Sequence, residues 1–261
     1  AVRRMSGFRA DWLALRNPAA ARARNRGLMA ELAAHFAGRA PPRVLDLGAG
    51  TGATMGAMAP HLPKGQCWRL VDSDPELLSH AVPPGGAGME PVPAELADDP
   101  EALFAPAPDL LTASALFDLA AAPWIDRIVT LAARHRVPVY AALSYDGREC
   151  WSPPHRLDAA ALTAFHADQM TDKGLGGPAL GPDAHAYLAD RLDRAGYRVL
   201  TAPSDWELSA PRDSRLIAAL AQGTGSAIRP FLGRETDLWL DARLAARSVR
   251  IGHRDLLALP A

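Results

Sequence analysis

The chain has 261 residues, of which 49% are hydrophobic, so it can form one large α/β domain or two small ones around a sizeable core. The formal net charge of −1 excludes a chain-wide attraction for polyanions, although residues 1–40 hold eight arginines and only two acids, Asp11 and Glu31. No apolar run approaches the roughly 20 residues that are needed to span a bilayer.

The first 40 residues are expected to be helical. Asn17-Pro18 is a favourable helix start, because asparagine caps helices well and proline suits the first helical position. One apolar stripe at four-residue spacing follows and ends before Gly38, formed by Leu28, Leu32 and Phe36. A shorter amphipathic piece lies upstream and carries Phe8, Trp12 and Leu15.

Strands and helices alternate with short links over residues 41–145. Strands are expected at Arg43–Leu47, at 68–72, after a Pro- and Gly-rich loop at 83–93, at 109–114 and at 137–143. Helices are expected at about 51–59, after Asp74-Pro75, after Asp99-Pro100 and around 124–131. This alternation favours a doubly wound, mostly parallel sheet with helices on both faces and right-handed crossovers.

The second half of the chain is less regular. Helices are expected at Asp158–Gln169 and 182–194, with a loop at 174–182 between them. A strand is expected at 197–200 and a closing strand at 248–259. The region between them, at 213–247, is expected to be helical with an interruption at Gly223-Thr224-Gly225. We expect these inserts and the helical N-terminal segment to form a lid over a ligand site.

A glycine-rich turn follows the first expected strand, with the sequence Val-Leu-Asp-Leu-Gly-Ala-Gly-Thr-Gly at residues 44–52. Glycines let the backbone approach a ligand closely, and ligands of open α/β sheets bind at the carboxyl ends of strands. Asp72 lies 20 residues after Gly52, at the end of the second expected strand. A carboxylate there can accept hydrogen bonds from both ribose hydroxyls of a nucleoside.

Two cofactors are compatible with the glycines alone, because Gly48-x-Gly50-x-x-Ala53 also satisfies the relaxed dinucleotide fingerprint. A dinucleotide would place its pyrophosphate at this loop, where the carboxylate of Asp46 would oppose it. S-adenosylmethionine (SAM) instead presents an ammonium and a sulfonium, so Asp46 favours SAM. An NAD-binding oxidoreductase stays as the alternative.

At this point the chain resembles the class I SAM-dependent methyltransferases. Residues 44–52 look like motif I of that family, and residues 70–75 look like its second motif, with the ribose acid at Asp72. Residues 94–96 lie where the family often has a residue near the adenine, and residues 109–116 resemble its fourth-strand motif. The resemblance covers residues 40–145 well.

The resemblance implies a seven-stranded sheet that ends in an antiparallel strand pair, expected at 197–208 and 248–259. It implies one domain over residues 1–261, with a helical lid at 1–40, a cofactor-binding half at 41–145 and a substrate-side half at 146–261. It also implies a SAM site made by Asp46, Gly48, Ala49, Gly50, Thr51, Gly52, Asp72, Ser73, Glu95, Leu96, Ser114 and Ala115. The product would be S-adenosylhomocysteine.

Methyl transfer is an in-line displacement that needs an aligned acceptor and sometimes a base, so no universal catalytic triad is expected. No Asn/Asp-Pro-Pro-Tyr stretch follows the fourth strand, which departs from the DNA amino-methyltransferases. No Pro-Cys motif is present, which disfavours cytosine C5 methylation through a thiolate. No His-rich or acidic cluster indicates a metal.

Asp118, just past the fourth strand, and His166, in the following insert, are the candidates for a base. Other polar groups are expected on the acceptor side, with Tyr145 and Asp146 directly after the fifth strand and His155, Asp168, Gln169 and Lys173 in the insert. Lys173 could hold an anionic substrate group or could be an ordinary loop lysine. Trp12 and Arg16 are expected to close over SAM.

The two cysteines, Cys67 and Cys150, show neither CxxC nor zinc spacing, and Cys67 is expected in a buried strand as a small apolar side chain. Because no secretory signal is evident either, we expect a cytoplasmic protein.

The leading hypothesis for function is methylation of a small molecule. The alternatives are an RNA or protein methyltransferase that docks through the Arg-rich residues 1–40, a non-catalytic SAM-binding relative, and the NAD-binding oxidoreductase. Steep salt dependence of substrate binding would support an RNA substrate.

Overall fold

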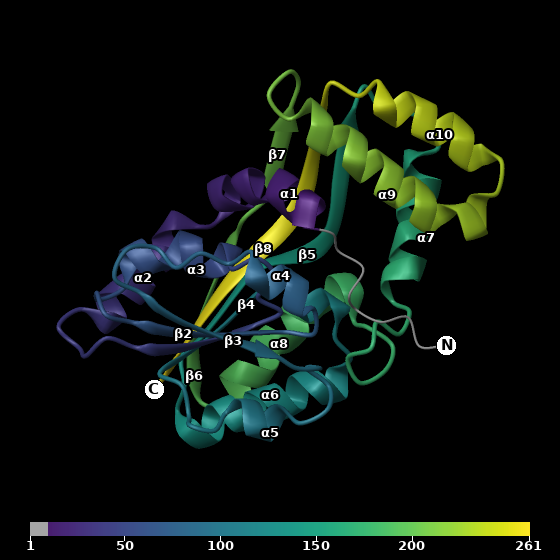
Figure 1. The fold of residues 1–261 in the computed structure, drawn as a ribbon. Coiled ribbons are helices and arrows are strands. Elements are labelled where there is room, and N and C mark those ends of the chain that lie inside the picture. Colours follow the sequence, from purple (N-terminus) through teal and green to yellow (C-terminus); the bar gives the residue numbers. More distant parts are fainter. Residues whose placement is uncertain (1–9) are drawn as a thin grey trace.

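The computed structural model describes residues 10–261. Strands alternate with helices along the chain, and the strands form one mixed sheet (Figure 1). The strand order is β3-β2-β1-β4-β5-β8-β6, and β7 also pairs with β8. The strands are β1 Arg43–Leu47, β2 Cys67–Asp72, β3 Gly88–Pro93, β4 Leu110–Ser114, β5 Val139–Ser152, β6 Tyr197–Pro203, β7 Trp206–Ser209 and β8 Ser248–Pro260. Strands β1 to β5 are parallel, whereas β8 runs antiparallel to its three neighbours.

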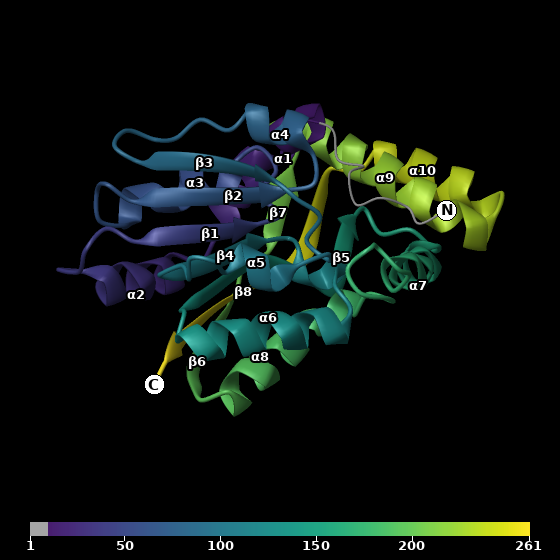
Figure 2. The same ribbon diagram turned by 60° about the horizontal axis from the view of Figure 1, so that its bottom comes forward.

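Helices cover both faces of the sheet, as expected for a doubly wound fold (Figure 2). They are α1 Ala10–Ala23, α2 Arg26–Phe36, α3 Ala53–Met58, α4 Pro75–Ser79, α5 Pro100–Leu103, α6 Ala122–His135, α7 Asp158–Gln169, α8 Ala184–Arg194, α9 Ser214–Leu232 and α10 Glu235–Leu244. Three short 3₁₀ helices are η1 Ala59–His61, η2 Phe117–Leu119 and η3 Gly181–Asp183. None of the helices within residues 10–261 is both long and apolar enough to cross a membrane.

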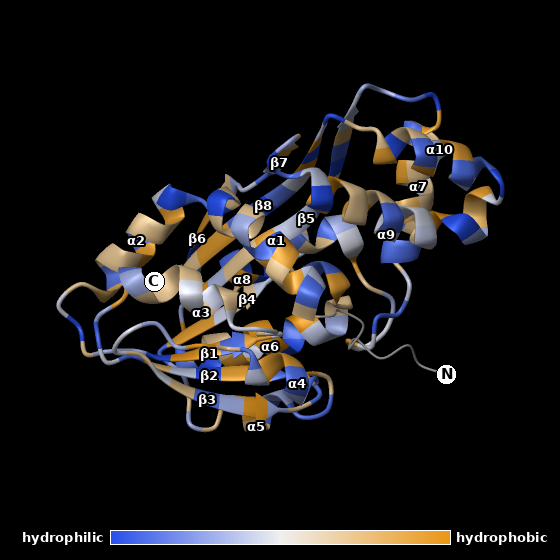
Figure 3. Cartoon of the chain, turned by 45° about the horizontal axis from the view of Figure 1, so that its top comes forward, coloured by the Kyte–Doolittle hydropathy of each residue, from blue (hydrophilic) through white to orange (hydrophobic). Residues whose placement is uncertain are grey.

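The two faces of the sheet have separate apolar cores. Helices α1, α2 and α3 share one core with side chains such as Leu32 and Trp68, and α5, α6 and α8 share the other with side chains such as Leu111 and Ile128. Strand β1 is buried on both faces from Val44 to Leu47, and its buried residues are apolar except for Asp46. Figure 3 shows apolar colour on much of β1, against mixed colour on β2 and on the surface helices α9 and α10.

Helices α7, α9 and α10 lie together beyond the carboxyl edge of the parallel strands, where they pack on extensions of β5 and β7 (Figures 1 and 2). The fifth strand was expected to end at residue 143, but it continues to Ser152 because β8 keeps pairing with it as far as Ser248. Tyr145 and Asp146 therefore lie within β5, and the prediction that they follow it is wrong.

The predicted helix start at Asn17-Pro18 is also wrong, because both residues lie inside α1. The break comes at Asn25, whose side-chain oxygen accepts a hydrogen bond from the Leu28 N–H at 3.1 Å and so caps α2. Trp12 and Leu15 of the expected amphipathic piece lie on α1, and Phe8 lies outside the described residues.

Other boundaries differ from the expectation for identifiable reasons. Strand β3 begins at Gly88, inside the loop expected at 83–93. Helix α9 runs through Gly223-Thr224-Gly225, since Gly225 faces α10, where an added Cβ would lie 3.5 Å from Leu240. The expected seven-stranded sheet is confirmed by the order β3-β2-β1-β4-β5-β8-β6, and residues 197–208 supply, besides β6, one more short strand, β7, which pairs with β8. Cys67, which was expected to be buried, is exposed at the start of β2.

A buried carboxylate, Asp255 on β8, joins three separate elements. It is fully inaccessible to solvent and accepts hydrogen bonds from Tyr140 Oη at 2.9 Å, the Leu143 N–H at 2.8 Å and the Asn25 N–H at 2.8 Å. Hydrogen bonds to a buried charge are among the strongest in proteins. Asp255 thus fixes the start of α2 against β5 and β8.

We expect Tyr140→Phe to lower the free energy of unfolding by about 1.5–3 kcal/mol, since it removes one hydrogen bond to a buried charged acceptor and leaves the ring in place. Urea denaturation measures the change. Tyr187→Phe is the matched control, because the Tyr187 hydroxyl donates to Asp126 at the surface, and we expect a much smaller loss. Equal losses in the two variants would contradict this role of Asp255.

Candidate cofactor site

The glycine-rich turn connects β1 to α3 through left-handed backbone. Gly48 has φ 64° and Gly52 has φ 75°, a region that glycine adopts without steric cost. An added Cβ would lie 3.0 Å from Leu116 at Gly48 and 3.0 Å from Ala81 at Gly52. The turn therefore requires glycine at both positions, for conformation as well as for space.

Asp72 at the end of β2 holds this turn in shape. Its Oδ2 accepts a hydrogen bond from the Gly50 N–H at 2.8 Å, and its Oδ1 accepts one from the Asp74 N–H at 3.0 Å. Partial burial raises the pKa of Asp72, although these backbone donors favour the carboxylate. Each oxygen keeps a second lone pair, so the carboxylate can also accept from a ligand hydroxyl.

A cavity opens between the turn, the ends of β2 and β4, and helix α1. Eight of the predicted cofactor residues line it: Gly48, Ala49, Gly50, Thr51, Asp72, Ser73, Ser114 and Ala115. From above, α1 contributes Leu13, Arg16 and Asn17. A Cβ at Gly50 would meet Leu13 at 3.1 Å, so α1 rests directly on the turn.

Four predicted residues do not line this cavity. Gly52 caps α3 behind the turn, Glu95 is exposed, and Leu96 is buried with its carbonyl accepting from Trp124 Nε1. Asp46 is fully buried beneath the turn, where Thr112 Oγ1 donates to its Oδ1 at 2.8 Å. Burial raises the pKa of Asp46 to about 7.

Sequence reasoning missed Arg24, a buried arginine directly after α1. Its Nη2 donates to Thr54 Oγ1 at 3.3 Å and to Ser114 Oγ at 3.2 Å, and its positive charge opposes the rise in the pKa of Asp46. The available signal was the adjacent Asn25, because a helix cap there ends α1 and turns Arg24 inward. Arg24 thus supplies the cation that the buried acid beneath the turn needs.

Arg16 and Asp118 form a second pair of opposite charges close to the cavity. Burial lowers the pKa of Arg16 to about 10 and raises that of Asp118 to about 6, while each charge partly offsets the effect on the other. Arg16 Nε and Asp118 Oδ1 are buried without a hydrogen-bond partner in the described chain. Such atoms are costly to bury, and a bound ligand could satisfy them.

The structure connects His166 to β5 rather than to the cavity. Tyr145 Oη lies 3.1 Å from His166 Nε2 and donates to Glu149 Oε1 at 3.3 Å. Burial raises the pKa of Glu149. The remaining acceptor-side candidates are held by their own partners: Lys173 pairs with Asp168 at 3.0 Å, Asp146 pairs with Arg148, and the His155 N–H donates to Asp158.

No family model and no curated protein matches the chain. A solved structure of a candidate type II methyltransferase from Anaeromyxobacter dehalogenans is 18% identical, covers 91% of this chain and 98% of its own, and has a TM-score of 0.50. A cyclopropane-fatty-acyl-phospholipid synthase-like protein from Lactobacillus casei is 14% identical, covers 92% and 98%, and has a TM-score of 0.52. The chain has the class I methyltransferase fold.

The strand order differs from that of the common dinucleotide-binding fold. The common dinucleotide-binding sheet has the parallel order 3-2-1-4-5-6. Here the antiparallel β8 lies between β5 and β6, which confirms the antiparallel ending that was expected from the resemblance.

We expect the carboxyl carbon of Asp118 to titrate near pH 6 in NMR spectra, since burial disfavours its charged form. Arg16→Met removes the positive charge that favours the carboxylate, so the titration midpoint should rise further. Arg22→Met is the control on the same helix, because Arg22 pairs with Asp213 instead. A lower or unchanged midpoint in Arg16→Met would contradict the coupling.

Proposed function

We propose that the protein is a SAM-dependent methyltransferase that acts on a small-molecule acceptor. The observation that carries the proposal is the position of Asp72, which shapes the glycine turn and faces the cavity of a methyltransferase fold. Asp72 would bind the ribose hydroxyls of SAM, and the turn would lie against the methionine part. The predicted roles of Glu95 and Leu96 near the adenine remain part of the proposal.

The charges around the cavity suit the methionine part of SAM. Its carboxylate could accept a hydrogen bond from Arg16 Nε, which has no partner in the described chain. Its ammonium and sulfonium would be favoured by the buried Asp46 and Asp118 through charge rather than direct contact. Both acids are buried, where such interactions are screened less than in water.

Helix α1 would have to move for SAM to enter. With α1 in place the cavity volume is about 80 Å³, whereas small-molecule sites usually measure roughly 300 Å³ or more. The side chains that fill the space, Leu13 and Asn17, come from α1 itself. We therefore propose that α1 swings outward and then closes over the cofactor, as the lid hypothesis requires.

In the reaction the acceptor lone pair forms a bond to the methyl carbon as the bond from carbon to sulfur breaks, and S-adenosylhomocysteine leaves. The protein aligns the two reactants and accepts a proton from the acceptor where one must leave. Asp118 does not line the cavity, but it is the base that we favour, because burial raises its pKa to about 6 and its Oδ1 has no hydrogen-bond partner among residues 10–261. His166 could accept the proton only indirectly, through the hydroxyl of Tyr145.

A small acceptor is favoured over a polymer because the polar groups on this side are buried. Asp118, Tyr145 and His253 are all less than 10% exposed, so within residues 10–261 these polar groups offer little surface to a nucleic acid. The arginines of the N-terminal segment also do not form a docking arm within residues 10–40. Arg24 is buried, burial also lowers the pKa of Arg16, and the exposed Arg22 pairs with Asp213. Arg26 and Arg39 are the other exposed arginines within residues 10–40.

A thermal-shift scan against SAM, S-adenosylhomocysteine, NAD and NADP tests the cofactor class. A ligand that binds only the folded state raises the melting temperature, so SAM and S-adenosylhomocysteine should do so and the dinucleotides should not. A shift with NAD or NADP alone would make the protein an oxidoreductase. Incubation with methyl-labelled SAM and metabolite extracts then separates an enzyme from a non-catalytic relative that only binds SAM.

We expect Asp72→Ala to weaken SAM binding by about 1–3 kcal/mol in calorimetry, the range for losing hydrogen bonds to a charged group. Asp72→Asn keeps the shape of the side chain and should lose part of that amount. The control is Asp237→Ala on α10, which removes an acid that pairs with Arg229 far from the turn. Unchanged affinity in Asp72→Ala would rule out the ribose assignment.

A further inference from the structure

A second cavity lies at the opposite edge of the sheet, where the parallel strands begin. Its volume is about 460 Å³, within the roughly 300–1,000 Å³ of small-molecule sites. Prolines before β1, β4 and β5, and at the end of β8, form its rim: Pro41, Pro108, Pro138 and Pro260. The five residues of β1 separate it from the glycine turn, a distance of roughly 16 Å at 3.3 Å per residue.

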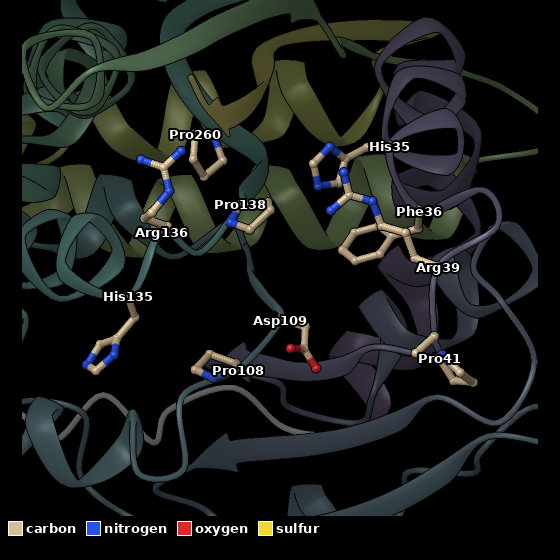
Figure 4. Close-up of a pocket in the computed structure, with 11 residues that line it drawn as sticks. His35, Phe36, Arg39, Pro41, Pro108, Asp109, His135, Arg136, Pro138 and Pro260 are labelled. Atoms are coloured by element: carbon tan, nitrogen blue, oxygen red, sulfur yellow. The ribbon is translucent and has the colours of Figure 1, made fainter.

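Basic residues line two sides of this cavity. Figure 4 shows His35 and Arg39 on one side and His135 and Arg136 on the other. The acid in the lining, Asp109, is neutralised by Arg43, whose Nε lies 3.1 Å from its Oδ2. The cavity therefore carries a net positive charge.

The Arg39 guanidinium is available to a ligand, since it makes no hydrogen bond or ion pair with any residue from 10 to 261. Burial lowers the pKa of His35, and the positive charges of Arg39 and Arg198 lower it further. Arg198 itself pairs with Glu31 outside the cavity. An anion placed here would relieve the repulsion between these groups.

Arg136 stands at a position that would suit glycine. It follows α6 with φ 53°, in the left-handed region, and its guanidinium donates to the carbonyl of Ala261. One guanidinium nitrogen is used in this way, and the planar group keeps further donors that can point into the cavity. Arginine donors in a fixed fork match the oxygens of a phosphate group.

We infer that this basic cavity, lined by His35, Arg39, His135 and Arg136, binds a small molecule that bears a phosphate ester or diphosphate group. The two arginines would hold the phosphate oxygens, and the imidazoles would add N–H donors. The ring of Phe36 and the proline rim would contact the apolar part of the ligand. The site is distinct from the cofactor cavity, and the inference does not depend on methyl transfer.

Calorimetric titration with inorganic pyrophosphate in phosphate-free buffer tests the inference. Arg39→Gln should weaken binding about tenfold or more, since it removes charge-assisted hydrogen bonds without removing a structural contact. Arg229→Gln is the control, because it lowers the net charge equally at a pair on α9 and α10, and its affinity should equal that of the wild type. Saturating S-adenosylhomocysteine should not displace pyrophosphate.

NMR of the wild-type protein gives a second measurement that needs no variant. The ring protons of His35 and His135 should shift together on addition of pyrophosphate. No binding by pyrophosphate, or an equal loss in Arg39→Gln and Arg229→Gln, would overturn the inference. Binding of a single-stranded RNA with a steep salt dependence, but not of pyrophosphate, would assign the cavity to nucleic acid and would equally overturn it.

Discussion

Buried charges hold α1 over the carboxyl ends of the strands and α2 against one face of the sheet, and the cofactor cavity depends on them. Asp255 accepts the Asn25 N–H, which sets the start of α2, and Arg24 donates to Thr54 and Ser114. Because these contacts fix residues 24 and 25, they also fix the direction in which α1 leaves. Helix α1 consequently lies on the glycine turn instead of projecting into solvent.

The same arrangement explains why so many ionisable groups near the turn have shifted pKa values. Asp46 and Asp118 are desolvated by the sheet and the helices above it, and each has an arginine close by, Arg24 and Arg16 respectively. Burying a charge is costly unless an opposite charge or hydrogen bonds compensate for it. Here the compensation is incomplete, because one carboxylate oxygen of each acid has no partner in residues 10–261.

Features that depend on neighbouring residues could be predicted from the sequence. Strand β1, the caps at Asp74 and Asp99 and the helix over Asp158–Gln169 follow from local patterns, and the structure confirms them. The glycine turn and the position of Asp72 beside it follow from the motif. They could be predicted because turn conformation, capping and strand alternation are encoded within a few residues.

Features that depend on distant partners could not be predicted. Strand β5 extends to Ser152 only because β8 pairs with it, and α9 passes through Gly225 only because that face packs on Leu240. The inward position of Arg24 depends on its hydrogen bonds to Thr54 on α3 and Ser114 on β4, which are distant in sequence. The contact between Tyr145 and His166 on the acceptor side could not be predicted either. It joins a strand residue to a helix residue 21 positions later, and no local pattern indicates that the two side chains meet.

The pairing of β8 with three other strands has a consequence for the order of assembly. Strand β8 is the last strand in chain order, yet it pairs with β5, β6 and β7. During synthesis these three strands emerge from the ribosome before the strand that joins them, so each presents an open edge until β8 arrives. Open strand edges can pair with other chains, and pairing across a long sequence separation is slow. The nascent chain is therefore most exposed to aggregation just before β8 has been made.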